Sequence, residues 1–113
     1  MNLQDVVSRL QLKPACAASL DVEVTGGYVS DLLSDVIANA REGSLWVTLQ
    51  THQNIVAVAA LKDLAGIVII NGKQPARETV QKAEQEAIPI LSTELPAFEI
   101  VCRLCKLGIT GSG

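Results

Sequence analysis

The chain has 113 residues, of which 49% are hydrophobic and only 3% aromatic, and its formal net charge is −3 at pH 7. A chain of this length forms one domain that buries roughly two thirds of its unfolded-chain surface, with a core built from aliphatic side chains. The negative charge, the scattered basic residues and the scarcity of aromatic rings exclude a basic nucleic-acid-binding surface and a stacking platform for RNA bases.

The terminal sequence and the hydrophobic runs predict a cytoplasmic protein without a membrane segment. Asp5 lies early in an N-terminus that has no long apolar core, so this stretch does not resemble a signal peptide. The longest wholly apolar run, Ile55 to Leu61, is far shorter than a membrane span. The three cysteines, an odd number, are expected to be reduced thiols.

An amphipathic helix and an edge strand open the predicted fold. Apolar side chains recur at helical spacing over residues 2–11, and Pro14 ends this helix. Apolar and polar residues then alternate over residues 20–24, which predicts a strand with one buried and one exposed face. This strand is expected to run into a turn at Gly26 and Gly27.

The clearest helical periodicity follows this turn. Residues 29–40 place apolar side chains at i, i+3, i+4, i+7, i+8 and i+11. Ser30 is the expected N-cap of this helix, and Gly43 is its expected C-terminal stop.

The stretch from Ser44 to Gly72 predicts a strand–helix–strand unit around which the rest of the chain is organised. Residues 44–49 are strand-forming, and residues 65–70 are apolar on both faces, as in the interior of a parallel sheet. Parallel strands need a crossover, and residues 54–62 have the length of a short helix. A strand remains the alternative for the apolar run within this helix.

Two helices and a short strand complete the pattern. Pro75 suits the first turn of a helix whose narrow apolar stripe ends at Ala87. Residues 88–91 predict a short strand, and residues 96–107 predict a last helix.

The alternation of strands with helices predicts the fold class. It indicates an α/β protein, a single small domain of three layers with a mainly parallel sheet of four or five strands and right-handed crossovers. The domain is expected to span residues 1–109, with residues 110–113 as a flexible tail.

Cys102 and Cys105 form a C-x-x-C motif, which raises the question of a redox or metal site. Redox motifs of this kind open a helix, where the dipole lowers the thiol pKa, whereas these cysteines lie in the second half of theirs. They share a helix face with Phe98 and Val101, opposite the charged residues. The sequence has no second pair of this kind and one histidine, so packing of the thiols is favoured over metal or redox chemistry, and no metal or cofactor is predicted.

Candidate binding residues lie in the loops that follow the predicted strands. In open parallel sheets the ligand crevice lies beyond the carboxyl ends of the strands. These loops are rich in hydroxyl, amide and glycine residues, and two precede helix N-termini, whose backbone N–H groups can hold an anion. Ordinary turns and caps use the same residue types, which is the competing interpretation. The candidate ligand-binding residues are Thr25, Gly26, Gly27, Thr51, His52, Gln53, Asn54, Asn71, Gly72, Lys73, Ser92 and Thr93.

No catalytic constellation is recognisable in the sequence. His52 is the only histidine and has no evident acid, nucleophile or metal partner, a situation more typical of a loop or capping residue. Neither G-x-x-x-x-G-K-[ST] nor G-x-G-x-x-G occurs, so Gly26 and Gly27 belong to neither of these phosphate-binding fingerprints. The chain is therefore predicted not to be an enzyme and not to transfer phosphoryl groups.

Three stretches of the sequence resemble the DRTGG domain family. They are VTGGYVSDLLSDVIANA at residues 24–40, SLWVTLQTHQNIVAVAALKDLAGIVIING at residues 44–72, and IPILST at residues 88–93. This family includes domains of phosphotransacetylases and of CBS-containing inorganic pyrophosphatases, and it is similar to the N-terminal domain of HPr kinase/phosphorylase. The chain looks closest to stand-alone bacterial members.

The resemblance implies a swivelling β/β/α domain, like the N-domain of HPr kinase, that regulates or dimerises rather than catalyses. The P-loop domain that carries catalysis in the kinase has no counterpart in these 113 residues. We therefore expect a regulatory module that binds a small anionic ligand or nucleotide at the strand carboxyl ends, a partner protein in bacterial signalling or metabolic control, or both. A structural dimerisation or interaction domain without a ligand is the alternative, and a thiol redox or kinase-related enzyme is less favoured.

An excess of apolar surface predicts a two-fold homodimer. The mean hydropathy is +0.33, the predicted central helix is apolar all round, and an apolar strand lies beside it. A lone domain would leave a larger apolar patch than monomers usually expose, and symmetric pairing is the commonest way to cover it. The alternative is that the chain's own five helices cover both faces of the sheet.

Overall fold

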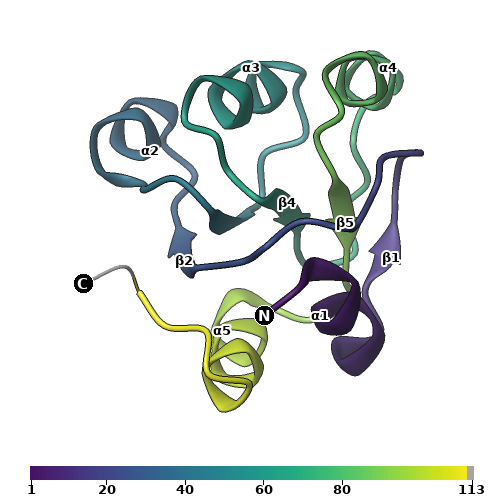
Figure 1. Cartoon of the computed structure of the whole chain (residues 1–113). Coiled ribbons are helices and arrows are strands. Elements are labelled where there is room, and N and C mark those ends of the chain that lie inside the picture. Colours follow the sequence, from purple (N-terminus) through teal and green to yellow (C-terminus); the bar gives the residue numbers. More distant parts are fainter. Residues whose placement is uncertain (112–113) are drawn as a thin grey trace.

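The computed structural model describes residues 1–111, and it contains helices on both sides of one sheet (Figure 1). No helix in this range is long and apolar enough to cross a membrane. In chain order the elements are α1 (Leu3–Leu10), β1 (Lys13–Pro14), β2 (Gly26–Val29), α2 (Leu33–Asn39), β3 (Ser44–Thr48), α3 (Asn54–Leu61), β4 (Gly66–Ile69), α4 (Arg77–Glu86), β5 (Ile90–Ser92) and α5 (Ala97–Lys106).

The sheet has five strands in the order β1-β5-β4-β3-β2. Strands β2 to β5 are parallel, and β1 pairs antiparallel with β5. Because successive parallel strands are added in one direction, right-handed crossovers place α2, α3 and α4 on the same face, and α1 and α5 cover the other face (Figure 1). The predicted three-layer α/β fold with a mainly parallel sheet is confirmed.

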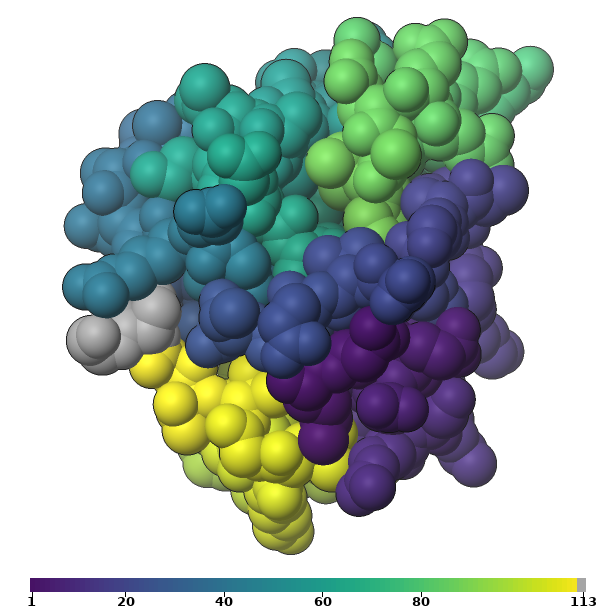
Figure 2. All heavy atoms as spheres, in the orientation of Figure 1, coloured from purple at the N-terminus to yellow at the C-terminus, as the bar shows by residue number. Residues whose placement is uncertain are grey.

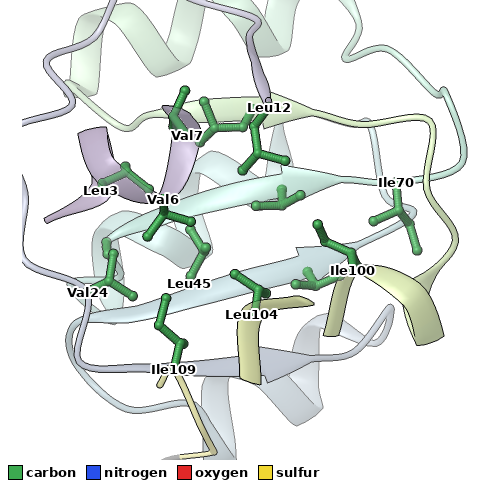
Figure 3. Close-up of a cluster of buried hydrophobic side chains, with 14 residues drawn as sticks. Leu3, Val6, Val7, Leu12, Val24, Leu45, Ile70, Ile100, Leu104 and Ile109 are labelled. Carbon is green, nitrogen blue, oxygen red and sulfur yellow. The ribbon is translucent and has the colours of Figure 1, made fainter. Parts of the chain in front are cut away.

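Each face of the sheet has its own hydrophobic core. Along β3, Leu45 and Val47 join the core beneath α1 and α5, whereas Trp46 joins the core beneath α2, α3 and α4. This alternation is the two-residue period of a strand, and it is why a central strand can be apolar throughout. In Figure 3, Ile100 and Leu104 of α5 point toward the sheet on the same side as the α1 side chains.

The central strand–helix–strand unit forms as predicted. The run from Ile55 to Leu61 is helical, so the strand alternative is wrong. Most of its side chains are buried, but Ala57 and Leu61 are exposed. The sheet beneath it is covered on both faces by helices of the same chain (Figure 1), so most of the apolar surface that motivated the homodimer is buried within one copy.

The structure corrects the prediction of a strand over residues 20–24. These residues run beside α1, where the N–H of Leu3 donates to the carbonyl of Val22 at 2.7 Å. Their alternating apolar side chains pack into the core beneath α1 and α5. The alternation therefore indicated one buried face correctly, but the backbone bonds to the start of a helix rather than to a sheet.

The predicted turn at Gly26 and Gly27 is also wrong, because both residues belong to β2, which pairs with β3. The helix predicted over residues 29–40 is shortened at its start for the same reason, since Val29 still lies in the strand. The Ser30 hydroxyl accepts from the N–H of Leu32 at 3.1 Å, so it closes the turn before α2 rather than capping the helix.

The segment between β1 and β2 covers the amino edge of the sheet. It has to cross from one edge strand to the other, and it passes along the amino ends of the parallel strands (Figure 1 and Figure 2). The N–H of Ala15 donates to Ile90 at 2.7 Å, and that of Thr25 donates to Gly43 at 2.9 Å. The amino ends of the parallel strands are therefore crossed by a segment of the same chain, whereas the carboxyl ends are followed by the loops that lead into α2, α3, α4 and α5.

The C-terminal segment lies along the edge strand β2. The N–H of Gly27 donates to the carbonyl of Thr110 at 3.0 Å, and Gly27 forms an isolated parallel bridge with Gly111. The flexible tail expected at residues 110–113 falls partly on residues 112 and 113, which lie outside the described residues.

Candidate functional site

The carboxyl ends of β4 and β5 form a topological switch point. The chain leaves β4 toward α4 on one face of the sheet, and it leaves the neighbouring β5 toward α5 on the other face (Figure 1). When the connections from adjacent parallel strands diverge in this way, they leave a crevice in which α/β proteins bind ligands.

A cavity of about 210 Å³ lies at this switch point. The loops after β4 and β5 form part of its wall, and the end of α1, the start of β1 and the side of α5 form the rest. Its lining residues are Leu10, Gln11, Lys13, Gly72, Gln74, Ser92, Thr93, Glu94, Leu95 and Arg103.

Backbone hydrogen bonds hold the two strand-end loops together. The N–H of Asn71 donates to Leu95 at 3.0 Å, and the N–H of Gly72 donates to Thr93 at 2.9 Å. Asn71 and Gly72 both have positive φ, 58° and 70°. A Cβ on Gly72 would meet the carboxylate of Glu94, so glycine allows the loops to approach this closely.

Two cationic side chains reach this cavity from different elements. Lys13 lies opposite Ser92, because β1 is antiparallel and therefore begins beside the carboxyl end of β5. Arg103 lies on α5, where its Nε donates to Glu99 at 3.0 Å. A guanidinium has five N–H donors, and this ion pair uses the one on Nε. Glu94 adds one carboxylate to the wall.

Three of the predicted binding residues, Gly72, Ser92 and Thr93, lie together in this cavity. Lys13 and Arg103 are not among the residues predicted from the sequence. An antiparallel two-residue strand gives almost no periodic signal, so nothing in the sequence places Lys13 beside β5. The helical pattern puts Arg103 on a charged, solvated face, and only the packing of α5 beside β5 brings that face to the cavity.

The prediction that Thr25, Gly26 and Gly27 lie at a strand carboxyl end is wrong. They lie at the amino end of β2, where the Thr25 hydroxyl donates to the carbonyl of Glu42 at 3.1 Å. The error follows from the misplaced strand. Residues 25–27 would follow a strand over residues 20–24, but they lie at the start of β2, which begins at Gly26. The loop that actually leaves the carboxyl end of β2 begins with Ser30.

Asp31, in this loop, holds the carboxyl ends of β2 and β3 together. Its carboxylate accepts from the hydroxyl of Thr48 at 2.9 Å and from the N–H of Leu49 at 2.7 Å. The side-chain amide of Gln50 donates to the Asp31 carbonyl at 2.8 Å. These bonds join the two loops and give Asp31 a structural role at this edge.

The residues Thr51, His52, Gln53 and Asn54 follow β3 as predicted, but they do not line the cavity. His52 Nδ1 accepts from the N–H of Asn54 at 3.0 Å, which fits the capping interpretation. The carbonyl of Thr51 accepts from the Thr79 hydroxyl at 2.7 Å and so anchors α4.

Asn71 and Lys73 belong to the same loop as Gly72, but they are not among the residues that line the cavity, and both side chains are exposed. Of the loop after β4, the backbone at Gly72 and the side chain of Gln74 face the cavity instead.

A polar pair fastens α2 to the edge strand. The Tyr28 hydroxyl lies 2.9 Å from both carboxylate oxygens of Asp35. Hydrogen bonds from Ser30, then Asn39 and Tyr28, hold the pKa of Asp35 below its ordinary value, and the bond to Asp35 raises the pKa of Tyr28.

The expected packing of Cys102 and Cys105 within the chain is wrong, because both thiols are exposed on α5. The buried residues of this helix are Ile100 and Leu104. The apolar arc of α5 is wider than the stripe that the sheet can cover, and the sequence gives no sign of which part stays outside. Within residues 1–111, no group of three or more His, Cys, Asp or Glu side chains is placed to hold a metal ion.

No protein-family model and no curated protein matches the sequence. Among solved structures, the chain is similar to the CBS and DRTGG domains of the regulatory region of Clostridium perfringens pyrophosphatase, determined in complex with the activator diadenosine tetraphosphate. The two share a fold. The TM-score is 0.68 at 13% sequence identity, and the match covers 96% of this chain and 47% of that chain. This chain therefore spans about half the length of its neighbour, and the likeness supports a DRTGG-like fold.

Proposed function

We propose that this chain is a regulatory module that binds a small anionic molecule, such as a nucleotide, in the switch-point cavity. The observation that carries the proposal is the convergence of Lys13 and Arg103 on a cavity at the carboxyl ends of β4 and β5. The chain as a whole is acidic, whereas this hollow brings together two cations from separate elements and only one lining carboxylate, that of Glu94.

The lining groups fit a ligand that has an anionic end and a hydroxyl or amino group. Lys13 and Arg103 are donors suited to phosphate or carboxylate oxygens. The amides of Gln11 and Gln74 can donate or accept, and the carboxylate of Glu94 can accept from a hydroxyl or an amine. A phosphorylated sugar or nucleotide combines both features.

The size of the cavity limits how much of a ligand it encloses. About 210 Å³ is below the roughly 300–1,000 Å³ typical of sites that bury a drug-sized molecule. The cavity would therefore hold the phosphate-bearing end of a nucleotide, with the remainder over the carboxyl edge. The structural neighbour is a regulatory region with a nucleotide activator, which makes adenine nucleotides and diadenosine tetraphosphate the first compounds to test.

Thermal unfolding in the presence of these compounds tests the proposal. A ligand at 100 times its Kd stabilises the folded state by about 2.7 kcal/mol, which is a readily measured rise in Tm. Lys13→Gln should abolish most of the rise, because Lys13 is exposed and its loss removes a ligand contact without removing core packing.

Lys73→Gln is the matched control, since Lys73 is an exposed lysine that does not line the cavity. It should respond to ligand as the wild type does. Equal responses of Lys13→Gln and Lys73→Gln would place the ligand elsewhere. If inorganic phosphate and the nucleotides all leave Tm unchanged at millimolar concentration, the proposal of a ligand fails.

The second candidate function is an interaction module without a ligand. It is favoured by the side chain of Phe98, which is 88% exposed on the outer face of α5. A flat thermal-shift screen combined with self-association or binding to another protein would support it. Both functions are those of a binding module in signalling or metabolic control, and neither includes a chemical step.

A further inference from the structure

The outer face of α5 is an apolar surface. Phe98 is the most exposed of the large hydrophobic residues, and with Ala97, Val101 and Cys102 it lines an open hollow. The charged residues Glu99 and Arg103 pair with each other on α5. Burying an aromatic ring is favourable in proportion to the area removed from water. Covering the Phe98 ring with a partner would therefore release free energy that a single copy does not gain.

A second apolar hollow, of about 210 Å³, adjoins this face. It lies between α5 and the edge strand β2, and Val101 lines both hollows. Its other apolar walls are Val29, Val47, Leu104 and Ile109. A protruding aromatic ring and an apolar recess therefore lie side by side on one surface.

We propose that a second copy of this chain covers the α5 face, with Phe98 of each copy seated in the hollow between α5 and β2 of the other. A two-fold interface uses the same patch on both copies, so the patch must carry both a protrusion and a matching recess. The α5 face has this self-complementarity. The proposal is independent of the ligand proposed for the switch-point cavity.

A stable dimer needs more contact area than the Phe98 ring alone provides. A standard interface buries about 800 Å² on each partner, roughly a seventh of the 5797 Å² surface of this chain. One Phe ring contributes about 150–250 Å² of this. Helix α5 has ten residues and is about 15 Å long, so the remainder has to come from its outer face and from the walls of the hollow between α5 and β2.

Charge on this face does not oppose a like copy at contact. Each chain carries a net charge of −3, so two copies repel each other weakly at long range, and a neutral contact surface adds no further repulsion between them. The hollows are lined almost entirely by apolar side chains, and the one ion pair of α5 is satisfied within its own chain. The edge of β2 beside Gly27 is already bonded to Thr110, so the contact joins side chains and does not extend the sheet.

The first test is the mass in solution of two matched variants at about 100 µM, well above the Kd of a micromolar dimer. Leu61 is 66% exposed and belongs to α3, which lies on the opposite side of the sheet from α5 (Figure 1), so Leu61→Asp is the control for Phe98→Asp. Light scattering should give twice the 12.0 kDa chain mass for the wild type and for Leu61→Asp. Phe98→Asp should give the single-chain mass with unchanged circular dichroism.

The second test uses the natural cysteines. Cys102 and Cys105 are exposed in one copy and would be covered in the dimer, whereas Cys16 lies in the segment after β1, away from α5. Modification of Cys102 and Cys105 by a thiol reagent should slow at least fivefold as protein concentration rises through the dimer range. In Phe98→Asp, and at Cys16, the rate should not depend on concentration.

A monomeric wild type at this concentration would overturn the proposal and leave the α5 face to a different protein. A dimer that survives Phe98→Asp and is lost in Leu61→Asp would also overturn it, by placing the interface on α3. Neither result bears on the thermal shifts produced by a ligand, so the two proposals can fail separately.

Discussion

Replacing Gly72 by alanine tests how the switch-point cavity is built. Gly72 has φ of 70°, and an added Cβ would meet the carboxylate of Glu94. The left-handed backbone costs an L-residue about 1–2 kcal/mol, and the lower entropy of the unfolded alanine chain offsets about 0.4–1 kcal/mol of this. Glu94 can swing away at little cost, so we expect a net loss of about 1 kcal/mol, or roughly 4 °C in Tm for a domain of this size.

Gly108→Ala is the matched control. Gly108 also has positive φ, 92°, but apart from Gly108 itself and its two chain neighbours, no heavy atom of the described chain lies within 4 Å of the place that a Cβ would take there. Urea unfolding should therefore show a similar loss of about 1 kcal/mol for both variants. Only Gly72→Ala should weaken ligand binding, because only there is the Glu94 carboxylate, which lines the cavity, displaced from its position.

Two results would refute this reasoning. A Gly72→Ala variant as stable as the wild type would show that Gly72 does not adopt the left-handed conformation. A loss several kcal/mol larger than that of Gly108→Ala would show that Glu94 is held in place rather than free to move. The double variant Gly72→Ala/Glu94→Ala removes the carboxylate. In a double-mutant cycle it separates the cost of the left-handed backbone from the cost of the contact with Glu94.

Three further predictions concern stability. The buried Ser44 hydroxyl has no hydrogen-bond partner in the described part of the chain, so Ser44→Ala should raise the free energy of unfolding by about 1 kcal/mol in urea titrations. The pKa of Asp35 is lower in the folded state than in the unfolded state. The ionised carboxylate therefore adds to the free energy of unfolding above the unfolded pKa of 3.8, and this stabilisation is lost as pH falls through the folded pKa. The pKa of Tyr28 is higher in the folded state than in the unfolded state. The protonated hydroxyl therefore adds fully to the free energy of unfolding below the unfolded pKa of 10.0, and this stabilisation is lost as pH rises through the folded pKa. The difference in the free energy of unfolding between the wild type and Tyr28→Phe should therefore be largest near neutral pH. A difference that does not depend on pH would contradict this. Ile100→Ala should cost about 3 kcal/mol, whereas Phe98→Ala should change the stability of the single copy by less than about 0.5 kcal/mol.

The central part of the fold could be read from the sequence because local signals agreed with each other there. Strands β3 and β4 are apolar on both faces, which identifies the interior of a parallel sheet before any contact is known. The intervening helix follows from the crossover that parallel strands require. Agreement between periodicity, length and topology made this unit predictable.

The region before it was misread because two physical signals competed. The alternation at residues 20–24 is stronger than anything in β2, which opens with two glycines. Glycine lowers strand propensity, so the sequence favours a turn, whereas the pairing of Gly26 and Gly27 with β3 is decided by tertiary structure. The misplaced strand then put Thr25 at the wrong edge of the sheet.

The candidate site was only partly predictable for a related reason. The rule that ligands bind at strand carboxyl ends identified Gly72, Ser92 and Thr93, since it needs only the order of the elements. Lys13 and Arg103 reach the same cavity through the antiparallel pairing of β1 and the packing of α5. Both are long-range arrangements that no local pattern encodes.

Helix α5 connects the two proposals, because it carries Arg103 at the cavity and Phe98 at the proposed dimer face. A ligand that draws Arg103 inward acts on a helix that packs as one body through Ile100 and Leu104. If binding and pairing favour different positions of this helix, each must change the affinity of the other by the same factor.

Sedimentation of the wild type with and without a bound nucleotide measures that factor directly. A coupling of about 1–3 kcal/mol would change the dimer Kd roughly 5- to 150-fold, in the same direction as pairing changes the affinity for the nucleotide. The Phe98→Asp variant supplies the reference, since as a monomer it should bind the nucleotide with the affinity of the unpaired wild type. A dimer Kd that is equal with and without saturating nucleotide would show that α5 holds one position in both states, and that the cavity and the apolar face act independently.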